Sequence, residues 1–291
     1  MVASSQPGGD PAGVPVDHAA DDRIYLFTRI VAGLLVVILT IGASLLYIWP
    51  LETDSRFAWP ISPAMTPLLM GSGYLAGAYY FLRLLLGRNW SHVGATLPAV
   101  AMFATIMLIT TVMHWDLFTH DHLAFYIWTG VYVIAPPLVV GIWLWNGKRD
   151  PGLADYDDFF VPRWARIAVG ALGVGATVLA AVLFFAPSLS ADFWPWTISP
   201  LTSRVLAGWF MLSATTSIVL AMDPRWSIWR VPLQTLVIWS VLMIIGMVRA
   251  IDDFEGGTAA SWMFPVGVAL AGASFLLFYA YMQRDRQNAQ V

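Results

Sequence analysis

Eight apolar stretches, separated by short polar connections, follow one another along the chain. A helix needs about 20 apolar residues, at ~1.5 Å per residue, to cross the ~30 Å hydrocarbon core of a bilayer. Each stretch meets this length. The pattern therefore predicts eight membrane-spanning helices, over residues 24–49, 63–86, 92–114, 123–145, 165–187, 200–222, 231–250 and 261–282.

The first half of the chain recurs in the second half at a shift of 137 positions. Thirteen of the 35 positions from 29 to 63 are identical to their counterparts. Apolar bias alone does not explain the polar and aromatic matches, which are Arg29 with Arg166, Trp59 with Trp196, and Ser62-Pro63 with Ser199-Pro200. Each half holds an even number of spans, so both halves should enter the membrane in the same direction, related by a two-fold axis along the membrane normal. The predicted fold is an all-α integral membrane protein made of two tandem parallel four-helix repeats.

The polar segments divide the chain into units. Residues 1–22 are polar and rich in glycine and proline, which indicates a disordered tail. The predicted units are this tail, a first four-helix repeat over 23–146, a linker over 147–164 with an Asp-Pro-Gly turn and an acidic run, a second repeat over 165–283, and a tail over 284–291.

The distribution of arginine and lysine predicts the orientation. With the amino terminus inside, twelve cations lie in or beside cytoplasmic segments, and three lie on the external side: Arg56, Arg204 and Arg249. Cytoplasmic loops carry the excess of positive charge in membrane proteins. Both termini are therefore predicted to be cytoplasmic. The chain also lacks the positive start and early apolar core of a secretory signal, so a multi-pass protein of the plasma membrane is expected.

Composition agrees with a membrane protein and excludes several classes of site. Hydrophobic residues make up 58% of the chain and charged residues 11%, with a mean hydropathy of +0.69. A bilayer accepts so much apolar surface directly, and it is the expected partner. The absence of cysteine excludes disulfides, iron–sulfur clusters and zinc–thiolate sites. A net charge of −3 gives no reason to expect a nucleic-acid partner.

A Trp-x-Ile-Ser-Pro motif precedes the second span of each half. Serine before proline is a common helix start, and tryptophan is frequent at the level of the lipid headgroups. A second interpretation is a ligand site, because positive helix ends beside arginines can hold an anionic headgroup or carboxylate. Its candidate residues are Arg56, Trp59, Ser62, Trp196, Ser199 and Arg204.

The external loop after the third span is rich in possible metal ligands. Histidine and aspartate bind zinc and neighbouring divalent metals, so the loop is a candidate metal site formed by His114, Asp116, His120 and His122. The spacing matches no established helical metal motif, and a solvated loop explains the same residues. No cofactor other than this divalent metal is indicated, since no two histidines are placed within spans at one depth, as a bis-histidine haem requires.

The interiors of the predicted spans contain no Asp, Glu, Lys or Arg at mid-depth. Proton-coupled transporters usually need such a group, and the chain also lacks catalytic motifs, which speaks against an enzyme. The leading hypothesis is a protein that binds or translocates a lipophilic or neutral solute at the interface of the repeats. The alternatives are an accessory or scaffold subunit that contacts other membrane proteins, and an external metal-binding protein or membrane enzyme.

Overall fold

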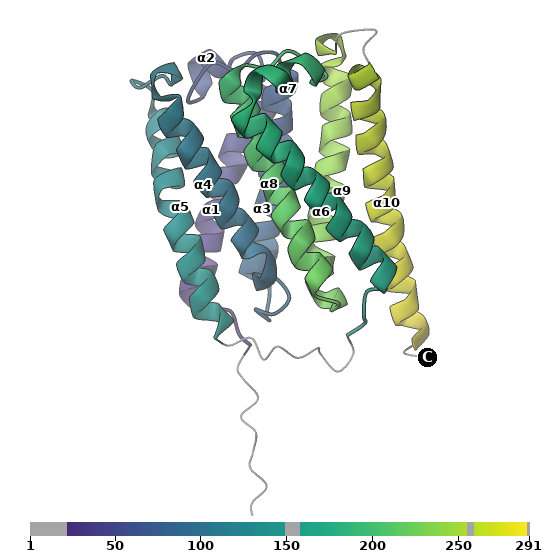
Figure 1. Ribbon diagram of the computed structural model, residues 1–291. Helices are drawn as coiled ribbons and strands as arrows, with labels where there is room; N and C mark the ends of the chain where they lie inside the picture. Colours follow the sequence, from purple (N-terminus) through teal and green to yellow (C-terminus); the bar gives the residue numbers. More distant parts are fainter. Residues whose placement is uncertain (1–21, 149–157, 255–258, 290–291) are drawn as a thin grey trace, which may run out of the picture.

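The structure, a computed structural model, describes residues 22–148, 158–254 and 259–289, with side chains up to residue 284. These residues form a bundle of helices that run between two ends (Figure 1). The long helices are α1 (Leu26–Ile48), α3 (Met65–Leu86), α4 (Leu97–Met113), α5 (Leu123–Gly147), α6 (Arg163–Phe185), α8 (Pro200–Met222), α9 (Trp226–Arg249) and α10 (Ala259–Ala289). Two short helices, α2 (Thr53–Arg56) and α7 (Pro187–Phe193), lie at what we call the upper end, and α10 ends at the lower end.

Seven of the long helices in the described part of the chain are long and apolar enough to cross a membrane, which makes this a multi-pass membrane protein. The exception is α3, which contains Gly71, Ser72, Gly73 and Tyr74. Fifteen of its 22 residues are buried, so most of α3 faces protein. A membrane helix can carry small and polar residues on the sides that contact other helices rather than lipid, and this accounts for its lower hydropathy.

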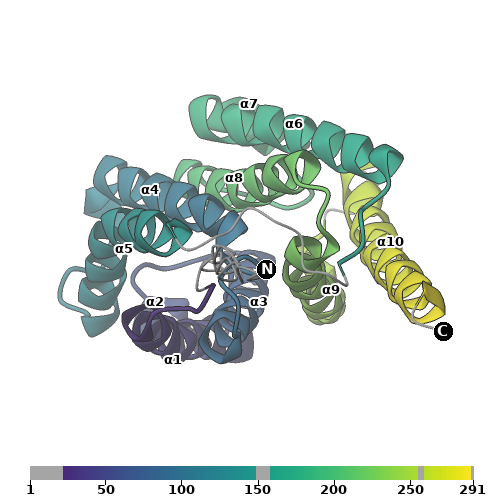
Figure 2. The ribbon, with the colours of Figure 1, turned by 90° about the horizontal axis from the view of Figure 1, so that it is seen from below.

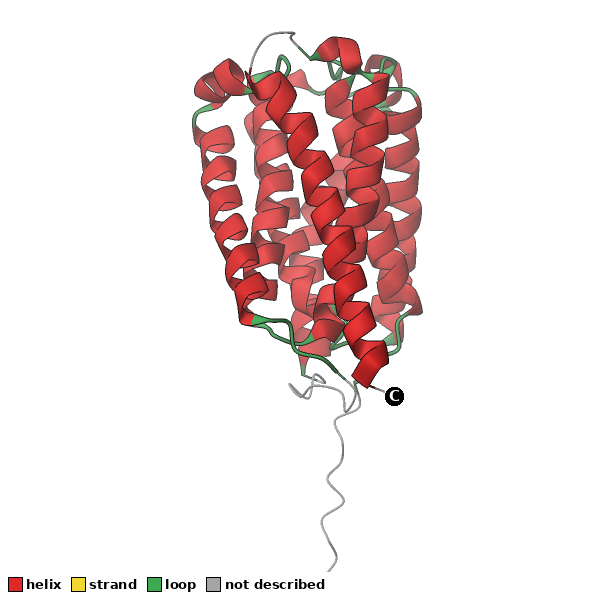
Figure 3. Ribbon diagram, turned by 90° about the vertical axis from the view of Figure 1, so that its right-hand side faces the viewer, coloured by secondary structure: helices red, strands yellow, loops and turns green. Residues whose placement is uncertain are grey.

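The helices contact one another in a regular order. Within the first part of the chain α3 packs on α1, and α4 packs on α5; within the second, α8 packs on α6, and α9 packs on α10. The two parts meet where α3 packs on α9 and where α4 packs on α8. We call α1, α3, α4 and α5 the first group of helices, and α6, α8, α9 and α10 the second group. The view along the helices shows the two groups side by side (Figure 2). The side view shows the long helices passing between the same two ends of the bundle (Figure 3).

Two pairs of helices approach each other closely at a glycine. A Cβ atom placed on Gly71 of α3 would lie 3.0 Å from the backbone nitrogen of Tyr47 in α1. In the second group, a Cβ on Gly173 of α6 would lie 3.0 Å from the Cβ of Ser217 in α8. Small residues let membrane helices approach this closely, and the resulting van der Waals contact is a main source of their association.

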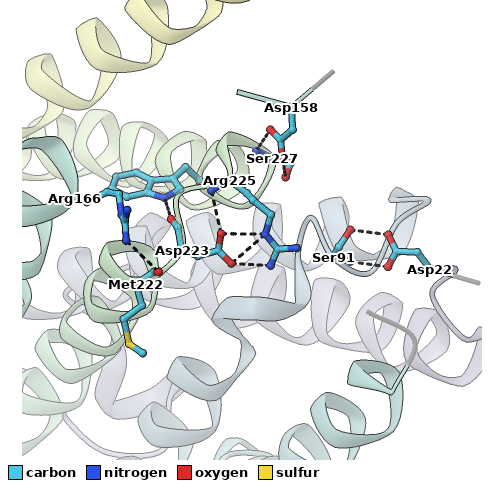
Figure 4. A network of polar contacts seen from close by, with 9 residues as sticks. Asp22, Ser91, Asp158, Arg166, Met222, Asp223, Arg225 and Ser227 are labelled. Carbon is cyan, nitrogen blue, oxygen red and sulfur yellow. Dashed lines mark hydrogen bonds and ion pairs between the residues drawn. The ribbon is translucent and has the colours of Figure 1, made fainter. Parts of the chain in front are cut away.

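Hydrogen bonds connect separate segments of the chain at the lower end (Figure 4). The carboxylate of Asp22 accepts from the backbone N–H and the hydroxyl of Ser91, at 3.0 and 2.6 Å, and Asp158 accepts from Ser227 at the same two distances. Each pair lies 69 residues apart in the sequence. Asp22 thus fixes the segment before α1 to the loop before α4, and Asp158 fixes the segment before α6 to the first turn of α9.

Two arginines donate hydrogen bonds to backbone carbonyl oxygens where helices end at the lower end of the bundle. Arg29 in α1 donates to the carbonyl oxygens of Leu85 and Gly87, at 2.8 and 2.6 Å. Arg166 in α6 donates to those of Ala221 and Met222, at 3.0 and 3.2 Å, and is drawn in Figure 4. The last carbonyls of a helix lack intrahelical partners and carry partial negative charge, so a guanidinium is well suited to them.

Several predicted element boundaries are wrong. The third predicted span, 92–114, begins later, because a 3-10 turn (Gly94–Thr96) precedes α4 and places Pro98 in its first turn, where proline causes no kink. Ser199 caps α8 as expected, but Ser62 does not cap α3, which begins at Met65. The carboxylate of Asp253 accepts from the backbone N–H of Met65 instead, at 2.6 Å. The predicted amino-terminal tail lies outside the described residues except for Asp22, and the predicted linker is described at 147–148 and 158–164. The predicted tail over 284–291 instead continues α10 as far as Ala289.

Candidate functional site

Most of the six residues predicted to bind a ligand have other partners among the described residues. Trp59 and Trp196, 3% and 1% exposed, belong to two separate aromatic clusters. Arg56 pairs with Glu52 at 2.7 Å, and Ser199 bonds to Thr202. Ser62 is exposed and Arg204 contacts His114, so the interactions found among the described residues join none of the six to another. Their direct role in binding stays a prediction.

The predicted metal ligands are also directed to different partners. His122 caps α5 by accepting from the backbone N–H of Ala124 at 3.3 Å, and the ring of His120 lies 4.7 Å from that of Phe125. Asp116 lies in an exposed 3-10 turn. Within the described ranges no three His, Asp or Glu side chains are close enough together to hold a metal ion. Metal binding by His114, Asp116, His120 and His122 stays a prediction.

His114 and Arg204 form a contact between α4 and α8 at the upper end. The Nε2 of His114 lies 2.9 Å from a guanidinium nitrogen of Arg204, and it can accept this hydrogen bond only when it carries no proton. Burial, and then the positive charge of Arg204, lower the pKa of His114 below its ordinary value of 6.5. Folding therefore favours the neutral form of the His114 imidazole.

This contact predicts a pH dependence of stability. Because the pKa of His114 is lower in the folded than in the unfolded chain, its contribution to stability is present above pH 6.5 and is lost as the pH falls below that value. We expect the thermal midpoint in detergent to fall less between about pH 7.5 and about pH 5.5 in His114→Gln than in the wild type. His120→Gln, which changes an exposed ring, is the control and should behave as the wild type. Equal losses in the wild type and His114→Gln would contradict the expectation.

A recess of about 270 Å³ lies at the upper end, where helices of the two groups meet. It is formed by the end of α1, the segment before α2, the start of α3 and the end of α9. Pro50 helps to form it, because proline cannot continue α1. Six apolar and two charged residues line the recess: Ile48, Trp49, Pro50, Leu51, Ala64, Leu68, Glu52 and Arg249.

The two charges of the recess are fixed by partners. Arg249 donates to the carbonyl oxygens of Tyr47 and Ile48 at the end of α1, and its guanidinium lies 5.3 Å from the centre of the Tyr47 ring. Glu52 pairs with Arg56, whose guanidinium lies 4.9 Å from the Trp49 ring. The recess thus combines an apolar wall with one positive and one negative group, which suits a molecule with an apolar body and a polar head.

A related arginine–aromatic contact lies on the other side of the upper end. The guanidinium of Arg204 lies 5.9 Å from the ring of Phe184, and Phe184 is 137 positions after Tyr47. The guanidinium comes from α9 in one case and from α8 in the other. The ring positions correspond in the two halves, whereas the arginine positions do not.

The sequence pointed to Arg249 only as an external cation, and it gave no signal for Glu52 or Leu68 as lining residues. Comparison of the chain with protein-family models, with curated proteins and with solved structures finds no match. The function must therefore be inferred from the contacts described above.

Proposed function

We propose that the protein consists of eight membrane-spanning helices in two parallel four-helix units, with α3 as the eighth span. The pattern of neighbours supports this, because exchanging α1, α3, α4 and α5 for α6, α8, α9 and α10 reproduces the main contacts between long helices. The Asp22–Ser91 and Asp158–Ser227 pairs, and the carbonyl contacts of Arg29 and Arg166, are further support. A two-fold axis along the helices relates such units.

The lower end is proposed to be cytoplasmic. Most of the arginines of the described chain belong to helix ends and loops at this end, and Arg56, Arg204 and Arg249 belong to the upper end. The chain contains no cysteine, so a single one can be introduced as a label site. In intact cells a membrane-impermeant maleimide should modify Leu117→Cys at the upper end and leave Phe160→Cys at the lower end unmodified; both residues are well exposed. The reverse pattern would refute this orientation.

We propose that the protein binds a lipophilic molecule with a polar head in the upper recess. The observation that carries the proposal is the recess itself, with its apolar wall, Glu52 and Arg249, at the junction of α1, α3 and α9. Its volume of about 270 Å³ is just below the ~300–1,000 Å³ typical of small-molecule pockets. Trp49, which lines the recess, and Arg56, whose guanidinium lies over the Trp49 ring, are residue types suited to the level of the headgroups.

Binding is favoured over translocation by the packing at mid-depth. The indole of Trp209 in α8 lies against α3, so that a Cβ on Gly73 would be 2.5 Å from the ring. The same ring lies 5.4 Å from Tyr74 and 4.6 Å from Phe103. Aromatic side chains thus fill the space between α3, α4 and α8. The accessory-subunit and metal-binding hypotheses stay predictions from the sequence.

A photoreactive lipid tests the recess. A fatty acid with a diazirine in its chain should label the peptide from residue 48 to residue 68 of the purified protein. Ala64→Phe, which places a ring in the recess, should reduce this labelling about tenfold, as expected for a loss of ~1.4 kcal/mol of binding free energy. The control Ala191→Phe adds the same ring at an exposed position of the upper end and should label as the wild type does. Undiminished labelling in Ala64→Phe would refute the proposal.

A further inference from the structure

A polar cluster joins α3, α9 and α10 towards the lower end, opposite the recess. The side-chain oxygen of Gln234 in α9 accepts from the hydroxyl of Tyr79 at 2.8 Å and from Arg83 at 2.7 Å, both in α3. Its side-chain nitrogen donates to the hydroxyl of Tyr279 in α10 at 2.7 Å. Gln234 is thus bonded on both sides, and the cluster lies where α3 of the first group meets α9 and α10 of the second.

Two guanidinium groups belong to this region without a negative partner. Arg83 is half-buried and bonds to Tyr79 and Gln234 through one terminal nitrogen only. Arg230 lies one turn before Gln234 on the same face of α9, and its Nε is buried with no hydrogen-bond partner. The ion pairs found among the described residues, such as Arg56–Glu52 and Arg225–Asp223, include neither Arg83 nor Arg230.

The cluster therefore has more hydrogen-bond donors than acceptors. The hydroxyl of Tyr279 accepts from Gln234 and also from Gln283, at 3.0 Å, so its own O–H remains to donate. Arg83 retains its Nε and its second terminal nitrogen as donors, and Arg230 retains its guanidinium. The buried Nε of Arg230 lacks an acceptor, which is unfavourable, and the two positive charges add to the imbalance. An anion with several oxygen atoms supplies the missing hydrogen-bond acceptors and also balances the positive charge.

We propose that this cluster binds a phosphate group. Guanidinium pairs match the geometry of phosphate oxygens, and basic pockets between membrane helices on the cytoplasmic side hold anionic lipid headgroups. The phosphate can come from such a lipid or from a phosphorylated solute. The lipid is favoured because Leu276 and Leu277 of α10, next to Tyr279 in the chain, are 54% and 70% exposed and offer an apolar surface for acyl chains. No part of this proposal depends on the upper recess.

Native mass spectrometry of the full chain in a neutral detergent tests the site. With phosphatidylglycerol, the wild type should retain about tenfold more lipid than with phosphatidylcholine, and Arg230→Gln should abolish the difference. Arg163→Gln removes an exposed arginine at the same end and should leave the preference intact. Tyr279→Phe, which removes a single hydroxyl with little change of shape, should weaken the preference severalfold even if Arg230→Gln does not fold.

The source of the phosphate is decided by competition. If phosphatidylglycerol is retained and millimolar inorganic phosphate does not displace it, the ligand is the lipid. If inorganic phosphate binds in an Arg230-dependent way and the two lipids bind equally, the ligand is a phosphorylated solute. If Arg230→Gln and Tyr279→Phe both fold and bind phosphatidylglycerol and inorganic phosphate as the wild type does, the phosphate site is overturned.

Discussion

Replacement of Trp196 by alanine should lower the free energy of unfolding by about 3–5 kcal/mol, the usual cost of removing a large buried aromatic side chain. Trp196 is 1% exposed, and its ring centre lies 5.2 Å from that of Phe264 and 5.3 Å from that of Trp194. Its indole N–H also donates to the hydroxyl of Thr66 in α3, at 2.9 Å. The substitution leaves both a cavity and a buried hydroxyl without this donor, at the junction between the two groups of helices.

Thermal unfolding of the purified protein in mild detergent measures this effect. Trp262→Ala provides the matched control, because Trp262 of α10 is 71% exposed and faces away from the bundle core. The melting temperature of Trp262→Ala should lie within a few degrees of that of the wild type, whereas that of Trp196→Ala should be much lower. If both variants unfold at the same temperature, the buried position of Trp196 is wrong.

Gly71→Ala should destabilise the protein by about 1–3 kcal/mol, the typical cost of one extra carbon in a packed interior. The added methyl would lie 2.9 Å from the Cβ of Tyr47 and 3.0 Å from its backbone nitrogen. A side chain can rotate away from a new neighbour, but a helix backbone can only move as a unit. The substitution therefore pushes α1 away from α3, and it should also weaken the contact of Arg249 with the end of α1.

Gly175→Ala is the control for this prediction. Gly175 lies in α6, and apart from its own neighbouring residues in the helix no atom lies within 4 Å of the place where its Cβ would be. Alanine is the better helix former by up to ~1 kcal/mol, so this variant should be as stable as the wild type or slightly more stable. A melting experiment in which Gly71→Ala is also neutral would show that α1 and α3 do not approach as described.

The spans could be predicted because their signal is local. Twenty apolar residues in a row are sufficient evidence for a membrane helix, so α5, α6 and α8 begin and end within two residues of the predicted stretches. The start of α4, at Leu97, lies five residues after the predicted residue 92. The start of α3 lies within two residues of its prediction, but the predicted cap is wrong. Asp253, 188 residues away, caps α3 in place of Ser62, and no local pattern reveals such a partner.

The candidate sites were harder to predict than the helices. Gln234 meets Arg83 across 151 positions, and Arg249 meets Tyr47 across 202. Such contacts depend on how each helix is rotated about its axis, and an apolar span facing lipid on one side and protein on the other shows little periodicity from which to read that rotation. The matched tryptophans were recognised, but their burial inside aromatic clusters was not, because the headgroup level and the core favour the same residue type.

The aspartate–serine contacts of the lower end have a consequence for synthesis. Because Asp22 and Ser91 are only 69 residues apart, their contact is available to the nascent chain once α1, α3 and the turn after them have been made. Nothing from the second half is required for it. The growing protein can thus join its first pair of helices at their lower ends and, after Asp158, repeat the same step with α6 and α8.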